Sequence, residues 1–282
     1  MSANPPSRRI ILCCHASAYG SRVLADLIAG IGSDSVAAVV VSTRIRYERG
    51  NALRDILSIV RTSGIRYAFY LLVITTVFNF FAHWRRSSNR YAFPSVARQC
   101  EKNRLPLFKT KNINSAQGRQ FIQRQVGAQD TILLTAMFNQ KLSIRVLSLP
   151  QLFCVNLHPG QLPQYRGVDP VLMACCEKQD YLEMTLHQTV AELDEGHVFR
   201  SKKIAVDPSA SLFAQQMRLF AVGADIFMQW LSDNASQDLR TMLASGKPQI
   251  GKPGYHSWPK KNQVAGLDKL ISLADLRFFF SR

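Results

Sequence analysis

The stretch that decides the fold runs from Asn156 to Asp194 and reads NLHPGQLPQYRGVDPVLMACCEKQDYLEMTLHQTVAELD. The apolar residues 152–155 just before it predict a short buried strand. Asn156 and His158 are then expected at the carboxyl end of that strand, where open α/β sheets hold their ligands. Alternation over residues 183–190 predicts a second strand, with Asp194 in the acidic turn that follows. We therefore expect an amide, an imidazole and a carboxylate to meet at one edge of a sheet.

The residues before this stretch predict a doubly wound, mostly parallel α/β sheet. Segments 9–14 and 37–41 read as strands on either side of a helix at 20–29, and the second strand is apolar throughout, as a strand buried on both faces is. Strands at 106–108 and 130–135 and helices through Cys100 and at 115–126 continue the alternation. The loop at 15–20 lacks a Gly-rich phosphate cradle, which disfavours a dinucleotide site.

The stretch resembles the signature of the folate-dependent formyltransferases, which include methionyl-tRNA formyltransferase and glycinamide ribonucleotide formyltransferase. That signature is Asn-x-His-Pro-Ser-x-x-Pro-x-x-(Arg or Lys)-Gly, then a strand with Thr-x-His, then Asp-x-Gly. The matching positions are Asn156, His158, Pro159, Leu162, Pro163, Arg166, Gly167, Thr185, His187, Asp194 and Gly196. Gly160 stands where Ser is usual, which puts only a local cap or hydrogen bond in doubt. Weaker similarity extends over about residues 9–206.

The resemblance implies the formyltransferase fold, 10-formyltetrahydrofolate as the formyl donor, and no metal. It assigns the catalytic roles to Asn156, His158 and Asp194. It also implies that the pterin site of the donor is lined by Gln140, Lys141, Leu142, Val190 and Leu193. A plain core role stays open for Leu142, Val190 and Leu193, and for His187 a core histidine and a supporting role are both open.

The resemblance further implies that Tyr165 and Arg166 form the rim at which the acceptor amine enters. Arg166 would orient a phosphate or carboxylate of the acceptor. A solvated loop arginine is the alternative.

The chemistry of formyl transfer suits the three catalytic candidates. When an amine attacks an amide-like carbonyl, negative charge builds on the oxygen. The side-chain amide of Asn156 and a protonated His158 can donate to it, and one such preorganised donor contributes roughly 3 kcal/mol. Asp194 would hold His158 protonated and accept the proton of the attacking amine, directly or through a water. Each residue alone could be a turn or surface residue, so the hypothesis rests on the three together.

Residues 1–206 are expected to form the catalytic domain, with an insertion at about 43–90, and residues 207–282 a carboxyl-terminal helix and a small appendage. The insertion contains the apolar run YAFYLLVITTVFNFFAHW at 67–84, with arginines on both sides, including Arg85, Arg86 and Arg90. A membrane-spanning helix needs about 20 apolar residues. Three placements stay open: a protein-buried helix or dimer contact, an element on the membrane surface, and a true span.

The composition is compatible with several classes of partner and does not choose among them. The net charge of +16 would attract RNA, an anionic membrane or polyanionic small molecules. The six cysteines include no Cys-x-x-Cys pair, which indicates neither a zinc site nor a disulfide framework and is typical of a reducing compartment. A cytoplasmic location is expected, with association with a membrane open.

The acceptor is expected to be a primary amine, either a small amine or an amino sugar linked to a nucleotide or a lipid. Methionyl-tRNA is the alternative, because the net charge suits tRNA, although the segment after residue 206 lacks the alternating strands of the barrel that holds tRNA in that enzyme. Two further hypotheses are hydrolysis of formyltetrahydrofolate and a non-catalytic, membrane-associated folate-binding module. The oligomeric state is left open.

Overall fold

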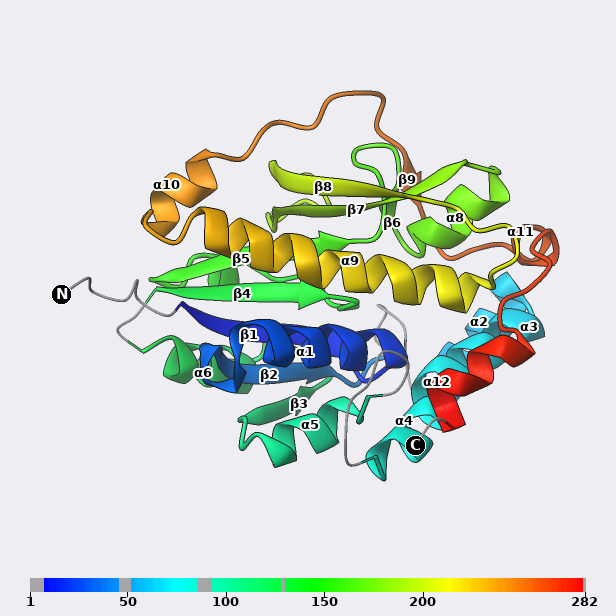
Figure 1. Cartoon of the computed structure of the whole chain (residues 1–282), viewed down its shortest axis with the longest axis horizontal. Coiled ribbons are helices and arrows are strands. Elements are labelled where there is room, and N and C mark those ends of the chain that lie inside the picture. Colours follow the sequence, from blue (N-terminus) through cyan, green and yellow to red (C-terminus); the bar gives the residue numbers. More distant parts are fainter. Residues whose placement is uncertain (1–7, 46–51, 86–92, 128–129, 281–282) are drawn as a thin grey trace.

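The computed structural model describes residues 8–45, 52–85, 93–127 and 130–280. Its centre is a seven-stranded sheet with the order β3-β2-β1-β4-β5-β7-β8 (Figure 1). Five strands are parallel: β1 (Arg9–His15), β2 (Val36–Ser42), β3 (Leu107–Thr110), β4 (Thr131–Ala136) and β5 (Leu152–His158). Antiparallel pairings add β7 (Tyr181–Gln188) and β8 (Val198–Ala205). The predicted doubly wound, mostly parallel sheet is confirmed.

Helices cover both faces of the sheet, which explains why the central strands are apolar throughout. In β1, Ile10 and Leu12 point into one hydrophobic core and Ile11 and Cys13 into the other, because neighbouring strand residues face opposite sides. The first core contains α1 (Ala18–Ile31), α5 (Val96–Lys102) and α9 (Leu212–Asp233), and the second contains α6 (Ala116–Val126) and α7 (Ile144–Leu147). In Figure 1, α9 runs alongside α1 across the sheet.

The segment after residue 206 shares this core. Phe213, Phe220 and Phe227 of α9 are fully buried within it. The boundary expected at residue 206 therefore does not separate two hydrophobic cores. Beyond α9 come α10 (Leu239–Ala244), β9 (Tyr255–His256), α11 (Lys261–Ala265), the 3-10 turn η3 (Leu273–Leu276) and α12 (Arg277–Phe280). The described part of this tail, residues 207–280, contains no β-barrel.

The insertion forms helices along one edge of the molecule, beside α12 (Figure 1). They are α2 (Ala52–Ser63), α3 (Ile65–Leu72), the π-helical turn η2 (Val73–Val77) and α4 (Phe78–His83). The continuous helix Ile65–His83 is long and apolar enough to cross a membrane by length and composition. One of its faces packs into the domain, where Phe78 meets Phe279 edge-on with ring centroids 6.0 Å apart. Arg86 and Arg90 lie outside the described residues.

Candidate active site

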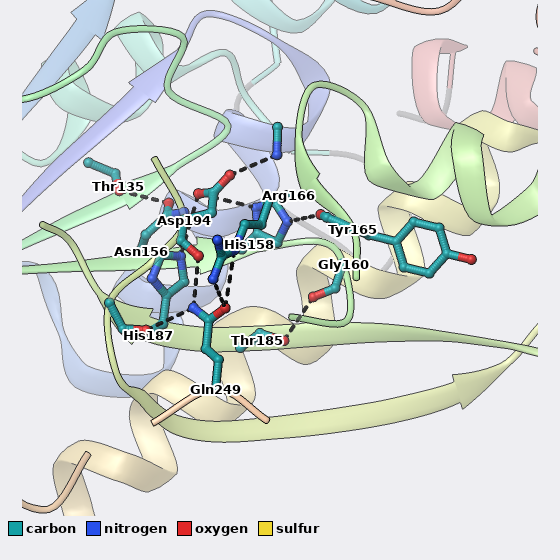
Figure 2. Close-up of polar contacts among 12 residues, drawn as sticks. Thr135, Asn156, His158, Gly160, Tyr165, Arg166, Thr185, His187, Asp194 and Gln249 are labelled. Atoms are coloured by element: carbon teal, nitrogen blue, oxygen red, sulfur yellow. Dashed lines mark hydrogen bonds and ion pairs between the residues drawn. The ribbon is translucent and has the colours of Figure 1, made fainter. Parts of the chain in front are cut away.

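The three predicted catalytic residues lie at the carboxyl end of the sheet (Figure 2). Strand β5 continues through His158, so Asn156 and His158 are its last polar residues and not part of a turn after it. Because they are two positions apart on a strand, their side chains share one face. Asp194 lies in the loop after β7 with a left-handed backbone, φ 57°. The structure thus brings together the amide, the imidazole and the carboxylate.

His158 and Asp194 form a buried pair. The Nδ1 atom of His158 lies 3.6 Å from Oδ1 of Asp194, and the two residues are only 4% and 7% exposed. On its other side, Nε2 of His158 lies 2.6 Å from the backbone oxygen of Tyr165. A carbonyl oxygen only accepts hydrogen bonds, so Nε2 must bear a proton. The ring is thus held between the Tyr165 carbonyl on its Nε2 side and the Asp194 carboxylate on its Nδ1 side.

Gly160 makes the contact between His158 and Tyr165 possible. A Cβ atom at position 160 would lie 2.9 Å from Nε2 of His158 and 2.9 Å from the backbone oxygen of Tyr165. Such distances are shorter than van der Waals contact allows, so any side chain here would displace one of the two groups. The departure from the usual Ser therefore affects the hydrogen bonding of His158 itself.

The amide of Asn156 is oriented by two neighbours. The Thr135 hydroxyl donates to Oδ1 of Asn156 at 2.7 Å, and Nδ2 of Asn156 lies 3.0 Å from Nε2 of His187. Nδ1 of His187 donates to the backbone oxygen of Gln188 at 2.8 Å, which leaves Nε2 as the acceptor. One hydrogen of the Asn156 amide is thereby used, and the second is available to a bound oxygen.

His187 is held neutral. Burial lowers its pKa to about 4, against an opposing effect from the nearby Asp194. Oδ1 of Asp194 lies 3.7 Å from Nε2 of His187, but a neutral ring whose Nε2 accepts a hydrogen bond forms no ion pair there. His187 therefore positions Asn156, which is the supporting role that the sequence left open.

Asp194 is fixed from both its side chain and its backbone. Its Oδ2 accepts a 2.9 Å hydrogen bond from the backbone N–H of Gly167 in β6 (Arg166–Gly167). The Gln249 amide donates to the backbone oxygens of Asp194 and Gly196 at 2.7 and 2.9 Å. Gly196 has no room for a side chain, since a Cβ there would lie 1.9 Å from the oxygen of Gln188. Gln249 was missed by the sequence analysis, because it lies far along the chain in a segment without a motif.

The two predicted rim residues lie beside the pair but are engaged with protein partners. Arg166 contacts Glu195 at 3.0 Å and donates to Oε1 of Gln249 at 2.8 Å. The Tyr165 side chain is buried, its hydroxyl donates to Glu177, and burial raises its pKa. Its ring stacks on His256 at 5.4 Å. An acceptor role for either residue stays a prediction.

The residues predicted for the donor site fall into two groups. The buried Gln140 side chain binds the backbone N–H of Ile113, the Ser42 hydroxyl and the Thr110 carbonyl, so it ties the ends of β2 and β3 together. Lys141 is exposed, and Leu142 is 4% exposed within the second core. Val190 and Leu193 are half-buried on the loop that bears Asp194. Of the five residues, Val190 and Leu193 are the two that share a loop with a catalytic candidate, Asp194.

A cavity of about 360 Å³ lies beside His256. Its walls are the segments 161–164 and 250–256 together with Glu177. Asn156, His158 and Asp194 do not line it; the Tyr165 ring stacks on His256, which does. Side-chain ligand atoms of His158, His187 and Asp194 lie within 4.8 Å of one another, a spacing that a metal could use, but Nε2 of His187 is already bonded to Asn156.

These contacts define what the site can do. The second Asn156 hydrogen is one donor at this site, and Nε2 of His158, which now binds the Tyr165 carbonyl, is a second one if a substrate oxygen replaces that carbonyl, beside a carboxylate that can accept a proton. Donors set in advance around a developing negative charge are the means by which proteins stabilise tetrahedral intermediates. The arrangement therefore suits attack of a neutral nucleophile on a carbonyl carbon.

Sequence comparison matches residues 48–231 to the family model "Formyl transferase". Methionyl-tRNA formyltransferase of Thermotoga sp. (strain RQ2) is 30% identical over 131 residues, which are 46% of this chain and 41% of that protein. The enzyme of the same name from Staphylococcus epidermidis is 24% identical over 138 residues, 49% of this chain and 44% of that protein. The chain thus spans less than half the length of these relatives.

Structural comparison finds the same fold in proteins of low sequence identity. An N-formyltransferase from Helicobacter canadensis, in complex with folinic acid and dTDP-3-aminofucose, has a TM-score of 0.54 at 11% identity and covers 89% of this chain and 71% of its own. Phosphoribosylglycinamide formyltransferase from Streptococcus pneumoniae has a TM-score of 0.51 at 12% identity, covering 80% and 98%. The matched family segment is more than half of the chain and contains Asn156, His158 and Asp194, so this chain belongs to the formyl transferase family.

Proposed function

We propose that this protein transfers a formyl group from 10-formyltetrahydrofolate to a primary amine. The observation that carries the proposal is the convergence of Asn156, His158 and Asp194 at the carboxyl end of β5, with each side chain held by its own neighbours. Membership of the formyl transferase family supports the same chemistry.

In the proposed mechanism, the second amide hydrogen of Asn156 and the protonated His158 donate to the formyl oxygen as the amine nitrogen attacks the formyl carbon. Asp194 keeps the positive charge beside His158 and accepts the proton that the amine loses. Collapse of the tetrahedral intermediate would break the bond to the folate nitrogen, which would take up the proton that Asp194 accepted. For His158 to reach the formyl oxygen with Nε2, the backbone oxygen of Tyr165 must give way to the substrate.

The proposed acceptor is a small amine, or an amino sugar linked to a nucleotide or a lipid, and the proposed location is the cytoplasm. Fold similarity to an N-formyltransferase in complex with dTDP-3-aminofucose is in keeping with this choice.

Methionyl-tRNA is the second candidate acceptor. It is favoured by the net charge of +16 and by the methionyl-tRNA formyltransferases that match about half of the chain. A polyanion of this size would be held mainly by its phosphates, so the two candidates differ in how they respond to salt.

Mass spectrometry tests the proposal. The full chain is incubated with 10-formyltetrahydrofolate and either pooled nucleotide-linked amino sugars and small amines or methionyl-tRNA, and products one carbonyl unit heavier are sought. We expect a formylated amine with the unmodified protein and at least a hundredfold lower rate with Asn156→Ala or His158→Gln, since each removes an oxyanion donor. His197→Gln, at an exposed histidine, is the matched control.

The other outcomes each point elsewhere. Formate released without any amine would indicate a hydrolase that uses water as its acceptor. Donor binding with neither product nor formate would indicate a folate-binding module. Either result would contradict the proposed transfer.

A further inference from the structure

The helix Ile65–His83 is apolar on two opposite faces. Its inner face repeats every three to four residues and is fully buried against the domain; it comprises Tyr67, Tyr70, Ile74, Phe78 and Ala82. A helix that served only as a core element would have a polar outer face. Here the outer face also carries apolar side chains, interrupted by Thr76 and His83 and continuing to Trp84: Ile65, Phe69, Leu72, Phe80 and Trp84.

These outer side chains are exposed to solvent. Ile65 is 70% exposed, Phe69 63%, Phe80 65% and Trp84 75%. The neighbouring helix α2 adds Leu53, Ile56 and Leu57 on one side of its own axis. More than half of the large apolar side chains that are exposed among the described residues fall between positions 53 and 84. We call these eight side chains the insertion face; clusters of this kind mark binding surfaces.

The insertion itself is basic, although Arg66 donates to the backbone oxygen of Leu267, which precedes the exposed Asp268. Between residues 52 and 85 the only acidic residue is Asp55, and it is buried, whereas Arg54, Arg61 and Arg66 are exposed. Lys261 of α11 adds a further exposed cation beside Gly64, at the junction of α2 and α3. An apolar face with a cationic border complements an anionic lipid surface, where basic side chains meet headgroups and apolar ones enter the acyl boundary.

The same charge argues against a second copy of this chain as the occupant. Two molecules that each bear a net charge of +16 repel one another, and the cations beside the insertion face would be brought together. A spanning helix is also disfavoured, since the inner face is bonded to the domain: Tyr67 donates to Asp169 at 2.8 Å and Tyr70 to Gln216 at 3.0 Å. The helix can therefore lie on a bilayer without leaving its place in the fold.

We propose that the insertion face binds the surface of an anionic phospholipid bilayer, with Phe69, Phe80 and Trp84 entering the headgroup region. Trp84 suits this depth, because an indole ring prefers the boundary between headgroups and acyl chains. The inference goes beyond formyl transfer and does not depend on it. If both hold, the amine to be formylated lies at a membrane, as a lipid-linked amino sugar would.

Vesicle co-sedimentation tests the inference. The full chain is mixed with phosphatidylcholine vesicles that contain either no anionic lipid or about 30% phosphatidylglycerol. We expect binding to the anionic vesicles, a blue shift of tryptophan fluorescence on binding, and weaker binding as salt rises. The variant Phe69→Gln/Phe80→Gln/Trp84→Gln should lower the partition coefficient by at least about tenfold. Because all three side chains are exposed, it should keep the melting temperature of the unmodified protein.

The matched control is Ile144→Gln/Ile250→Gln, which removes two exposed apolar side chains far from the insertion and should bind as the unmodified protein does. Absence of binding to anionic vesicles would overturn the inference, as would equal losses in the two variants. So would a dimer in light scattering that the triple variant abolishes, which would assign the face to a second copy. Formylation of a soluble amine is measured separately, so failure of vesicle binding and failure of the proposed activity give different results.

Discussion

Thr135 reaches the proposed chemistry only through Asn156. Its hydroxyl fixes Oδ1 of Asn156, so Thr135→Val frees the amide to rotate while leaving every proposed reacting group present. We expect kcat to fall by about fivefold with KM little changed, since a hydrogen bond of this kind contributes about 1 kcal/mol. The matched control is Thr189→Val, whose buried hydroxyl has no hydrogen-bond partner in the described structure. Equal effects of the two variants on kcat would contradict the positioning role.

His187 gives a pH dependence with a defined sign. Its pKa is about 4 in the folded protein and 6.5 when unperturbed, so between these values the unfolded chain binds a proton that the folded one does not. The free energy of unfolding should therefore fall as the pH is lowered from about 6.5 to about 4, by at most about 3 kcal/mol from this group.

Chemical denaturation across this pH range tests the prediction. The variant His187→Asn retains an acceptor for the Asn156 amide and should show a flatter profile, whereas His197→Gln should not. An unchanged slope in His187→Asn would mean that the ring is protonated in the folded protein.

The three candidate catalytic residues could be proposed from the sequence because their spacing matches a family signature, but the residues that hold them in place could not. Thr135 lies in an apolar strand. The neighbouring sequence does not show whether its hydroxyl binds another side chain, such as that of Asn156, or only the backbone. Gln249 contacts Asp194 and Gly196 across more than fifty residues of chain. Only the tertiary fold brings such residues together. Gly160 was noted as a departure, but its effect on His158 depends on where the oxygen of Tyr165 lies.

At the scale of elements, the insertion is anchored to the domain through Asp169, which has a left-handed backbone at the start of α8 (Pro170–Cys176). Its two carboxylate oxygens accept hydrogen bonds from Tyr67 of α3 and Gln216 of α9, at 2.8 and 2.7 Å. Gln216 in turn accepts from Tyr70, whose hydroxyl lies 2.5 Å from that of Tyr19 in α1. Four helices are thus joined by one polar network inside the apolar core.

The Asp169 network predicts a pH dependence opposite to that of His187. Burial raises the pKa of Asp169 from 3.8 to about 6, so the folded protein holds a proton that the unfolded chain releases between these values. The contribution of Asp169 to stability should therefore decrease as the pH rises from about 4 to about 6. Asp169→Asn, which suits a left-handed backbone, should remove this decrease in denaturation experiments. Asp34→Asn, at an exposed carboxylate, is the control, and a decrease that persists in Asp169→Asn would assign it to another group.

Loss of the Tyr70 hydroxyl tests the anchoring itself. Tyr70→Phe would leave the buried side-chain oxygen of Gln216 without its donor, at a cost of about 1–3 kcal/mol in the free energy of unfolding. Tyr255→Phe, at an exposed tyrosine, should change it little. If the network anchors the insertion, the rate of amide hydrogen exchange in Tyr70→Phe should rise mainly in α3. An equal rise in exchange rate throughout the protein would contradict this.

The strands and the long helices follow from local patterns, because a strand buried on both faces is apolar throughout and a surface helix repeats every 3.6 residues. The insertion could not be placed in this way. A helix that is apolar on two faces gives the same sequence signal whether one face, both or neither meets the protein. Only the packing of Tyr67, Tyr70 and Phe78 against the domain separates its inner side from the insertion face.

At the scale of the whole molecule, the net charge of +16 separates the two candidate acceptors. If the acceptor is tRNA, kcat/KM should fall by several orders of magnitude between about 50 and about 200 mM salt, because bound phosphates release counterions. A small amine should show a change of less than about tenfold over the same range. Steady-state rates with each acceptor in a salt series provide the measurement. A steep loss of kcat/KM with a small amine as salt rises would mean that the positive charge of the protein attracts this substrate as well.

The family segment of this chain ends at residue 231. Gln249, which donates to the backbone oxygen of Asp194, and strand β9, which pairs with β6, both lie beyond it. A chain truncated at residue 231 would keep Asn156, His158 and Asp194. It would lose Gln249, whose hydrogen bonds hold the loop that bears Asp194. We therefore expect substitutions at Gln249 to change the rate of the proposed transfer by loosening the loop that bears Asp194, while the proposed reacting groups stay unchanged.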